Sequence, residues 1–154
     1  MKFTYCARNG LQVFAGIRAR NDVRARLGLP YRIFAKTTFS ENSTDAFGGV
    51  LLQAWYDKND YVTGVQLYEP EARFEFRGQS ILGASVREVE RALQGLNAHY
   101  EFEEDGSGLK LLADGLELGL YAPDAKDDKE AKVEAVYIPI PRLMDDDAAF
   151  STQR

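Results

Sequence analysis

Few residues in this sequence have the chemistry of a nucleophile, a general base or a metal ligand. The chain of 154 residues holds one histidine, His99, and one cysteine, Cys6. Zinc sites built from several histidines and cysteines are therefore excluded, as is an intramolecular disulfide. Neither residue belongs to a G-x-S-x-G or cysteine-protease pattern, and no Gly-rich phosphate-binding motif occurs. The sequence therefore predicts no catalytic residue, no metal site and no cofactor, and we expect a protein that is not an enzyme.

Carboxylates are the remaining groups that could do chemistry. They are dense at Glu101, Glu103, Glu104 and Asp105, and again between residues 124 and 130. Glu101 and Glu103 share one face of a predicted strand, because side chains alternate with a period of two. Paired acids can hydrolyse glycosides or hold Mg²⁺ or Ca²⁺, so a carboxylate-based hydrolase stays an alternative. A solvated hairpin fits the same pattern, as does a docking surface for a basic partner that includes Glu101 and Glu103.

Aromatic residues gather on two predicted hairpins: Trp55, Tyr56, Tyr61, Tyr68, Tyr121 and Tyr137. In the segment 116–121 the leucines take one strand face, so Tyr121 takes the other, and the repeat alignment given below places Tyr56 at the equivalent position, with both tyrosines exposed. Tyrosine and tryptophan are common interface anchors. Trp55, Tyr56, Tyr61 and Tyr121 are therefore candidate partner-binding residues. Ordinary packing of half-buried tyrosines is the alternative explanation.

Charge is divided unevenly along the chain. Residues 1–77 hold 11 Lys/Arg and 8 Asp/Glu, net +3, whereas residues 78–154 hold 8 and 16, net −8, which together give −5. A net negative charge argues against general nucleic-acid binding, which needs clustered cations. We expect the partner to be another protein, a basic one if it meets the acidic half. Oligomeric state cannot be inferred from these counts.

No membrane-spanning or exported character is indicated. Residues 1–16 lack the apolar core of a signal peptide, and no run of about 18 apolar residues occurs anywhere. We therefore expect a cytoplasmic protein with no membrane partner.

Local patterns predict two helices and many short strands. The segment 85–96 places Val86, Val89 and Leu93 on one stripe, and Ser85 with Glu88 forms a capping box. A shorter helix is predicted over 21–27, capped by Asn21 or Asp22 and ended by Gly28. Strands are predicted at 3–5, 31–38, 50–56, 61–68, 73–76, 98–102, 109–112, 116–121 and 132–138.

An internal repeat is indicated by spacing. Val23 and Val89 lie 66 residues apart, Leu51 and Leu116 lie 65 apart, and Val62 and Val133 lie 71 apart. The increase accommodates about six extra residues in the charged loop 123–131. The chain then reads as one globular domain, 1–154, with similar halves at about 17–76 and 83–139 and an acidic tail at 142–154. Chance similarity between amphipathic elements is the alternative.

The order of a short helix ending in Leu27-Gly28-Leu29-Pro30, a polar loop, an aromatic strand and a V-x-x-V strand resembles the unit of small-protein-A-like domains. Two such units in tandem are similar to β-lactamase-inhibitory-protein-like domains, and the size and acidity are similar to those of bacterial immunity-type proteins. This resemblance implies helices packed on an antiparallel sheet, and binding rather than catalysis. No site residue is carried over from it.

These observations together predict an α+β fold with antiparallel sheets, helices packed on one face, and a tandem repeat of helix-plus-β-hairpin units. We expect a non-catalytic bacterial protein-binding module, such as an inhibitor, an immunity-type protein or an adaptor. The alternatives are a small-ligand carrier and the carboxylate-based hydrolase.

Overall fold

A computed structural model describes residues 1–143 of the chain, and most of its regular structure is β-strand. The helices in this range are η1 (Gln12–Phe14, a 3-10 turn), α1 (Arg20–Leu27) and α2 (Val86–Gly95). The strands are β1 (Lys2–Cys6), β2 (Gly10–Leu11), β3 (Tyr31–Phe34), β4 (Thr44–Phe47), β5 (Leu52–Tyr56), β6 (Val62–Tyr68), β7 (Arg73–Phe76), β8 (Gln79–Ser80), β9 (His99–Phe102), β10 (Gly108–Ala113), β11 (Leu116–Tyr121) and β12 (Ala135–Pro139). The predicted tail at 142–154 lies outside the described residues beyond Leu143.

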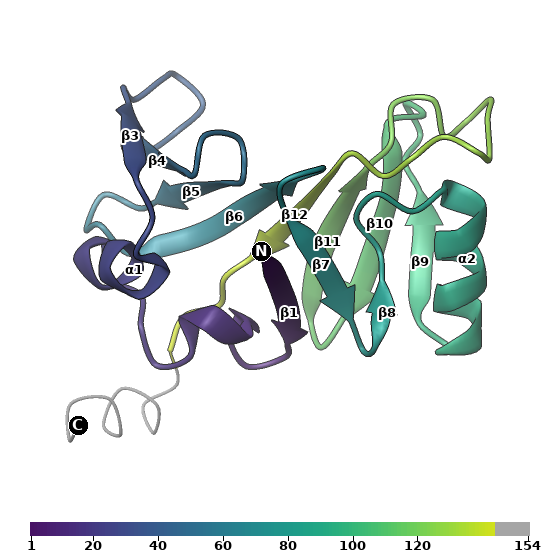
Figure 1. The fold of residues 1–154 in the computed structure, drawn as a ribbon, viewed down its shortest axis with the longest axis horizontal. Helices are drawn as coiled ribbons and strands as arrows, with labels where there is room; N and C mark the ends of the chain where they lie inside the picture. The colour runs from purple at the N-terminus through teal and green to yellow at the C-terminus, as the bar shows by residue number, and fades with distance from the viewer. Residues whose placement is uncertain (144–154) are drawn as a thin grey trace.

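The larger sheet has eight strands in the order β3-β4-β5-β6-β12-β11-β10-β9, and every neighbouring pair is antiparallel (Figure 1). It consists of two four-stranded runs, β3 to β6 and β9 to β12, which meet where β6 pairs with β12. A helix precedes each run, α1 before β3 and α2 before β9. The predicted α+β class with antiparallel sheets is confirmed at this level.

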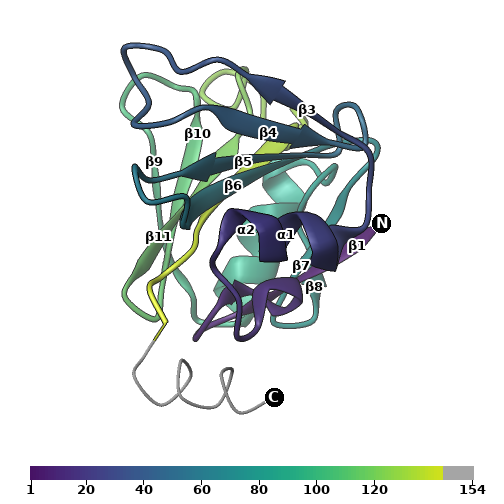
Figure 2. The same ribbon diagram turned by 90° about the vertical axis from the view of Figure 1, so that its left-hand side faces the viewer.

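A smaller sheet of four strands, β2-β1-β7-β8, lies against the larger one. Its β1 and β7 pair in parallel, which the expectation of antiparallel strands missed. Figure 2 shows α1, α2 and this small sheet on the same side of the eight-stranded sheet. That side of the sheet is therefore covered, and its other side carries no helix among the described residues.

The core fills the space between these layers. Six residues of β6, β12 and α2 are fully buried there: Val65, Leu67, Val89, Leu93, Val136 and Ile138. They belong to one cluster that also contains residues of β1, β7 and both α-helices. Burial of this apolar surface is the main stabilising contribution to the fold. No helix within residues 1–143 has both the length and the apolarity needed to cross a membrane.

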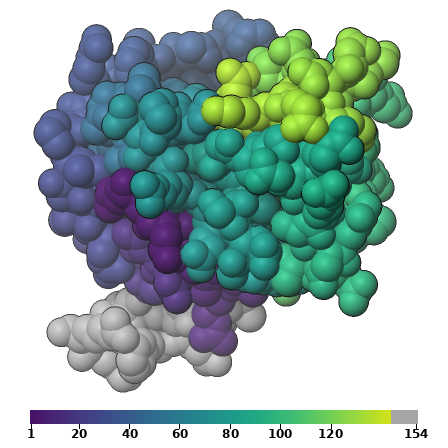
Figure 3. Space-filling model, turned by 45° about the vertical axis from the view of Figure 1, so that its right-hand side comes forward, coloured from purple at the N-terminus to yellow at the C-terminus, as the bar shows by residue number. Residues whose placement is uncertain are grey.

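Helix α2 begins as the capping pattern predicts. Ser85 Oγ accepts the amide of Glu88 at 3.1 Å, and its hydroxyl lies 3.0 Å from a Glu88 carboxylate oxygen. The loop before β12 satisfies two further amides of the first turn, since Val86 N donates to the carbonyl of Ala131 and Arg87 N to that of Lys129. Figure 3 shows this loop, in yellow-green, on the surface beside the region of α2.

Loss of the Ser85 cap should weaken the protein measurably. Replacing Ser85 by alanine is expected to lower the free energy of unfolding by about 1 kcal/mol, because the amide of Glu88 loses its acceptor. Urea unfolding would measure this, with Ser80→Ala at an exposed position of β8 as the control. Equal stability of the two variants would contradict the capping role.

Helix α1 differs from the prediction at its start. It begins at Arg20, its N-cap residue is Ala19, and neither Asn21 nor Asp22 is the cap. The reason is tertiary, because the amide of Arg20 donates to the carbonyl of Asp60 in the β5–β6 turn. Its end is as predicted: Gly28 adopts a left-handed conformation with φ of 61°.

Candidate functional site

A cavity of about 810 Å³ lies at the end of the β5–β6 hairpin, on the surface. Most of the side chains that shape it are aromatic or charged: Glu41, Trp55, Lys58, Tyr61, Tyr137 and Arg142. They come from four separate places in the chain, namely the segment before β4, the β5–β6 hairpin, β12 and the residues after it. A volume of this size is typical of pockets that bind small ligands or take up a side chain of a partner.

Two of the lining residues, Trp55 and Tyr137, also lie on the uncovered side of the eight-stranded sheet. Along their strands Trp55, Tyr68, Tyr121 and Tyr137 alternate with buried residues and so point away from the core; we call these four residues the aromatic face. The rings of Trp55 and Tyr137 lie edge to face, with centroids 6.0 Å apart. Gly64 stands between them in the sheet, opposite Trp55 on β5 and Pro139 on β12. A Cβ atom at residue 64 would overlap the Tyr137 hydroxyl, so glycine here allows that ring to lie across the sheet.

A buried ionic cluster lies on the other side of the same strands. The Asp45 carboxylate on β4 is fully buried and accepts hydrogen bonds from Arg20, Arg24 and the Tyr56 hydroxyl at 2.8 to 3.3 Å. The Arg20 guanidinium also stacks on the Tyr56 ring, 4.4 Å from its centroid. A buried charge requires such complete hydrogen bonding, because desolvation would otherwise outweigh its attraction to the partners.

These contacts determine the ionisation of the cluster. Burial alone would raise the pKa of Asp45, but the hydrogen bonds from Arg24, Arg20 and Tyr56 hold this pKa below its usual value. For Tyr56, burial and the adjacent Asp45 carboxylate raise the pKa above that of a free phenol. Asp45 is therefore an anion and Tyr56 a neutral donor across the ordinary pH range.

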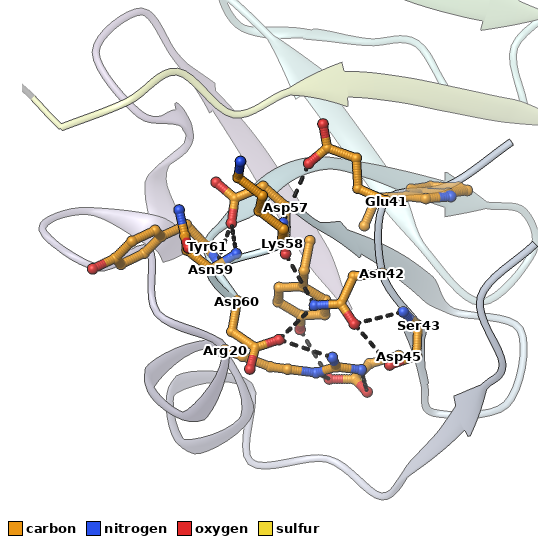
Figure 4. Close-up of polar contacts among 12 residues, drawn as sticks. Arg20, Glu41, Asn42, Ser43, Asp45, Asp57, Lys58, Asn59, Asp60 and Tyr61 are labelled. Carbon is orange, nitrogen blue, oxygen red and sulfur yellow. Dashed lines mark hydrogen bonds and ion pairs between the residues drawn. The ribbon is translucent and has the colours of Figure 1, made fainter.

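The cluster is linked to the cavity wall through Asp60 (Figure 4). Arg20 donates to Asp60 at 3.2 Å, and the same carboxylate oxygen accepts the Asn42 amide at 2.7 Å. Asn42 also donates to the carbonyl of Asp57 at 2.9 Å. The Asp57 carboxylate then accepts the amides of Asn59 and Tyr61, which closes the turn. The buried charges thus help to hold the two segments, 41–43 and 57–61, that form one wall of the cavity.

The structure separates the six predicted partner-binding residues. Trp55 and Tyr61 line the cavity, as does Tyr56 with a side chain that is only 3% exposed. The expectation that Tyr56 and Tyr121 share an exposed face is wrong, because Tyr56 alternates inward with Leu52 and Ala54 while Tyr121 is 48% exposed.

Glu101 and Glu103 lie elsewhere. Glu101 is on β9, at the far edge of the sheet from β3, and Glu103 follows that strand in the hairpin turn. The structure therefore does not join them with Trp55 and Tyr61 in one patch. Their expected contact with a basic partner stays a prediction that concerns a separate surface.

Sequence reasoning missed other residues of the site. Glu41 and Arg142 line the cavity from segments without a periodic pattern. Asp45 was missed because β4, which contains it, was not predicted as a strand, and a single aspartate among polar residues gives no sign of burial. Arg20 and Arg24 lie four residues apart on α1, and this spacing of charged residues is equally typical of a solvated helix face.

No group of three or more His, Cys, Asp or Glu residues within residues 1–143 is arranged to hold a metal ion. No protein-family model matches the chain, and comparisons with curated proteins and with solved structures gave no match either. Function is therefore inferred from the geometry of this chain alone.

Proposed function

We propose that the protein is a non-catalytic protein-binding module whose aromatic face and adjoining cavity receive a segment of a partner protein. The observation that carries this proposal is the uncovered side of the eight-stranded sheet, which presents Trp55 and Tyr137 beside a cavity of about 810 Å³. Large aromatic side chains with few torsions are the usual anchors of protein interfaces.

The chemistry of the cavity indicates the character of the partner segment. Lys58 and Arg142 reach its rim, and neither has an acid within ion-pair distance among residues 1–143. The two acids of the lining are already engaged, since Glu41 accepts the amide of Lys58 and Asp57 accepts those of Asn59 and Tyr61. We therefore expect an apolar side chain of the partner to enter beside an acidic one. At this surface we therefore propose an acidic partner segment, in place of the basic partner expected from the sequence.

We also propose that the two four-stranded runs form a tandem repeat, which accounts for a sheet wide enough to present such a face. Its support comes from the ladder registers. Leu52 pairs with Leu67 and Ala54 with Val65 in the first run. The proposed repeat relates β5 to β11 by an offset of 66 residues and β6 to β12 by an offset of 71 residues. Ala54 then corresponds to Leu120 and Val65 to Val136, and Leu120 does pair with Val136 in the sheet. The same offset of 66 relates Val23 to Val89 in the helices.

This offset differs by one residue from the 65 suggested by sequence alone for β5 and β11. A slip of one residue moves every side chain to the opposite face of a strand. At 66, Trp55 corresponds to Tyr121 and both point outward, whereas Tyr56 corresponds to Ala122 and both are buried. The aromatic face then has one ring from each half at equivalent positions.

Three features disfavour the hydrolase alternative. Glu101 and Glu104 are exposed at the β9 edge and its turn. Bonds from Ser107 lower the pKa of Asp105, whereas a general acid needs a raised one. The acids nearest the cavity are held in turn hydrogen bonds.

A small-ligand carrier is the second candidate, and the cavity volume is the observation that favours it. This cavity opens at the surface, so a ligand could enter it without a rearrangement of the core. Native mass spectrometry of the purified protein would detect a retained ligand, and loss of that ligand in Trp55→Ala would support the carrier.

The proposal is tested by comparative affinity capture from a lysate of the source cells. Wild-type protein, Trp55→Ala and Val50→Ala are immobilised in equal amounts, and bound proteins are quantified by mass spectrometry. Val50 is the control because it is 64% exposed and lies outside the cavity and the aromatic face. We expect one protein captured by the wild type and Val50→Ala, and depleted at least about tenfold with Trp55→Ala. Identical protein profiles for all three would contradict the proposal.

A further inference from the structure

The two edges of the eight-stranded sheet carry opposite charge. At one edge, β3 and the residues after it hold Arg32 and Lys36 and no acid before Glu41. At the other edge, β9 and its turn hold Glu101, Glu103 and Glu104. No strand within residues 1–143 covers either edge.

Both edges also expose apolar side chains. Ile33 is 59% exposed and Tyr31 43% on β3, and Phe102 is 40% exposed on β9. Long apolar edges invite pairing with another strand, and proteins usually protect them with charges that repel a like edge. Here the charges repel a like edge but attract the opposite one.

The backbone groups at the two edges are positioned to continue the ladder. The amide of Gly48 donates to the carbonyl of Pro30, and hydrogen-bonded pairs alternate along an antiparallel ladder, so Tyr31 and Ile33 direct their N–H and C=O groups outward. By the same rule the bond from Glu103 N to Gly108 O leaves the groups of Tyr100 and Phe102 outward on β9.

We propose that β3 of one molecule pairs with β9 of a second copy, so that the eight-stranded sheet continues from one molecule into the next. An even number of alternating strands makes β3 and β9 run in opposite directions, so two copies in the same orientation meet as an antiparallel pair. One register brings all the outward groups together: Tyr31 opposite Phe102, Arg32 opposite Glu101, and Ile33 opposite Tyr100.

Side chains agree with this register on both faces. Arg32 and Glu101 both lie on the uncovered side of the sheet, where they form a cross-strand ion pair. On the covered side the apolar pairs meet, and the nearby cations are already neutralised, since Arg24 binds Asp45 and Lys129 binds Glu90. The contact is head-to-tail, so its product is a growing chain or a ring rather than a closed dimer.

Sedimentation and light scattering across a wide range of concentration test this proposal with purified full-length chain. We expect the average mass of the wild type to rise with concentration, and to fall in high salt. Arg32→Glu and Glu101→Arg should each weaken self-association at least about tenfold, because like charges then face each other across the pair. Arg73→Glu, the same change of charge at an exposed position of β7 in the smaller sheet, should assemble as the wild type does.

The decisive experiment mixes the Arg32→Glu variant with the Glu101→Arg variant. Each weakened variant carries the complement of the other, so an equimolar mixture should regain the mass that neither reaches alone. Circular dichroism of each variant checks that these exposed substitutions leave the fold intact. A wild type that stays monomeric at every concentration would overturn the proposal, as would assembly insensitive to Glu101→Arg, which would indicate pairing of β3 with β3.

Discussion

Replacing Asp45 by asparagine is expected to lower the free energy of unfolding by about 3–5 kcal/mol. The substitution removes the buried carboxylate that Arg20 and Arg24 share, and the side chains of these arginines are only 10% and 20% exposed. A buried guanidinium without its counter-charge loses far more than the modest value of an exposed ion pair. Urea unfolding at neutral pH measures the change.

The difference in the free energy of unfolding between wild type and Asp45→Asn should also depend on pH, and the direction of this dependence follows from the pKa of Asp45. Because the folded pKa of Asp45 is lowered, its contribution to stability is present above the ordinary aspartate pKa of about 3.9 and is lost as pH falls through the folded value. The difference in stability between wild type and Asp45→Asn should therefore shrink in acid.

Asp60→Asn is the matched control, since Asp60 also binds Arg20 but its side chain is 58% exposed. We expect a loss of at most about 1 kcal/mol for this variant. Equal losses for the two aspartates, or a difference that grows in acid, would refute the role assigned to Asp45.

Replacing the cluster as a whole should restore the stability that the single substitution removes. Under the proposed tandem repeat, Val86 corresponds to Arg20 and Leu109 corresponds to Asp45. Val86 and Leu109 are both fully buried. In the variant Arg20→Val, Arg24→Met, Asp45→Leu, Tyr56→Phe both arginines that pair with Asp45 are replaced together with it, so no buried charge of the cluster is left without a partner. Apolar replacements of buried ion pairs are often neutral or stabilising. We expect recovery to the wild-type free energy of unfolding or above it.

The same fourfold variant should loosen the cavity wall, because Asp60 loses its bond from Arg20. Amide hydrogen exchange in the turn 57–61 is expected to accelerate while exchange in α2 stays unchanged. If the variant remained as unstable as Asp45→Asn, the correspondence between the halves would lose its support. If it were stable with unchanged exchange in the turn, the cluster would not position the wall.

The elements that could be predicted from sequence are those whose local pattern agrees with their packing. Helix α2 has an apolar stripe and a side-chain cap, and both are observed. Strand β11 alternates leucine with polar residues, and its bounds are as predicted. In these segments burial follows the period of the element, so sequence and structure carry the same information.

The remainder depends on contacts between distant segments. Strand β4 was missed because its buried Asp45 is made acceptable only by arginines from α1. The orientation of Tyr56 was predicted wrongly because a one-residue error in an alignment reverses a strand. The parallel pairing of β1 with β7 joins residues about 70 positions apart, which no local pattern records.

The most direct test of the proposed function is the affinity of the captured partner for wild type, Gly64→Ala and Val50→Ala, measured by calorimetric titration. Gly64→Ala removes no aromatic ring but displaces that of Tyr137 from its place beside Trp55. Binding at the aromatic face predicts an affinity at least about tenfold weaker for Gly64→Ala and unchanged for Val50→Ala. Equal affinity of all three proteins would show that the partner binds elsewhere.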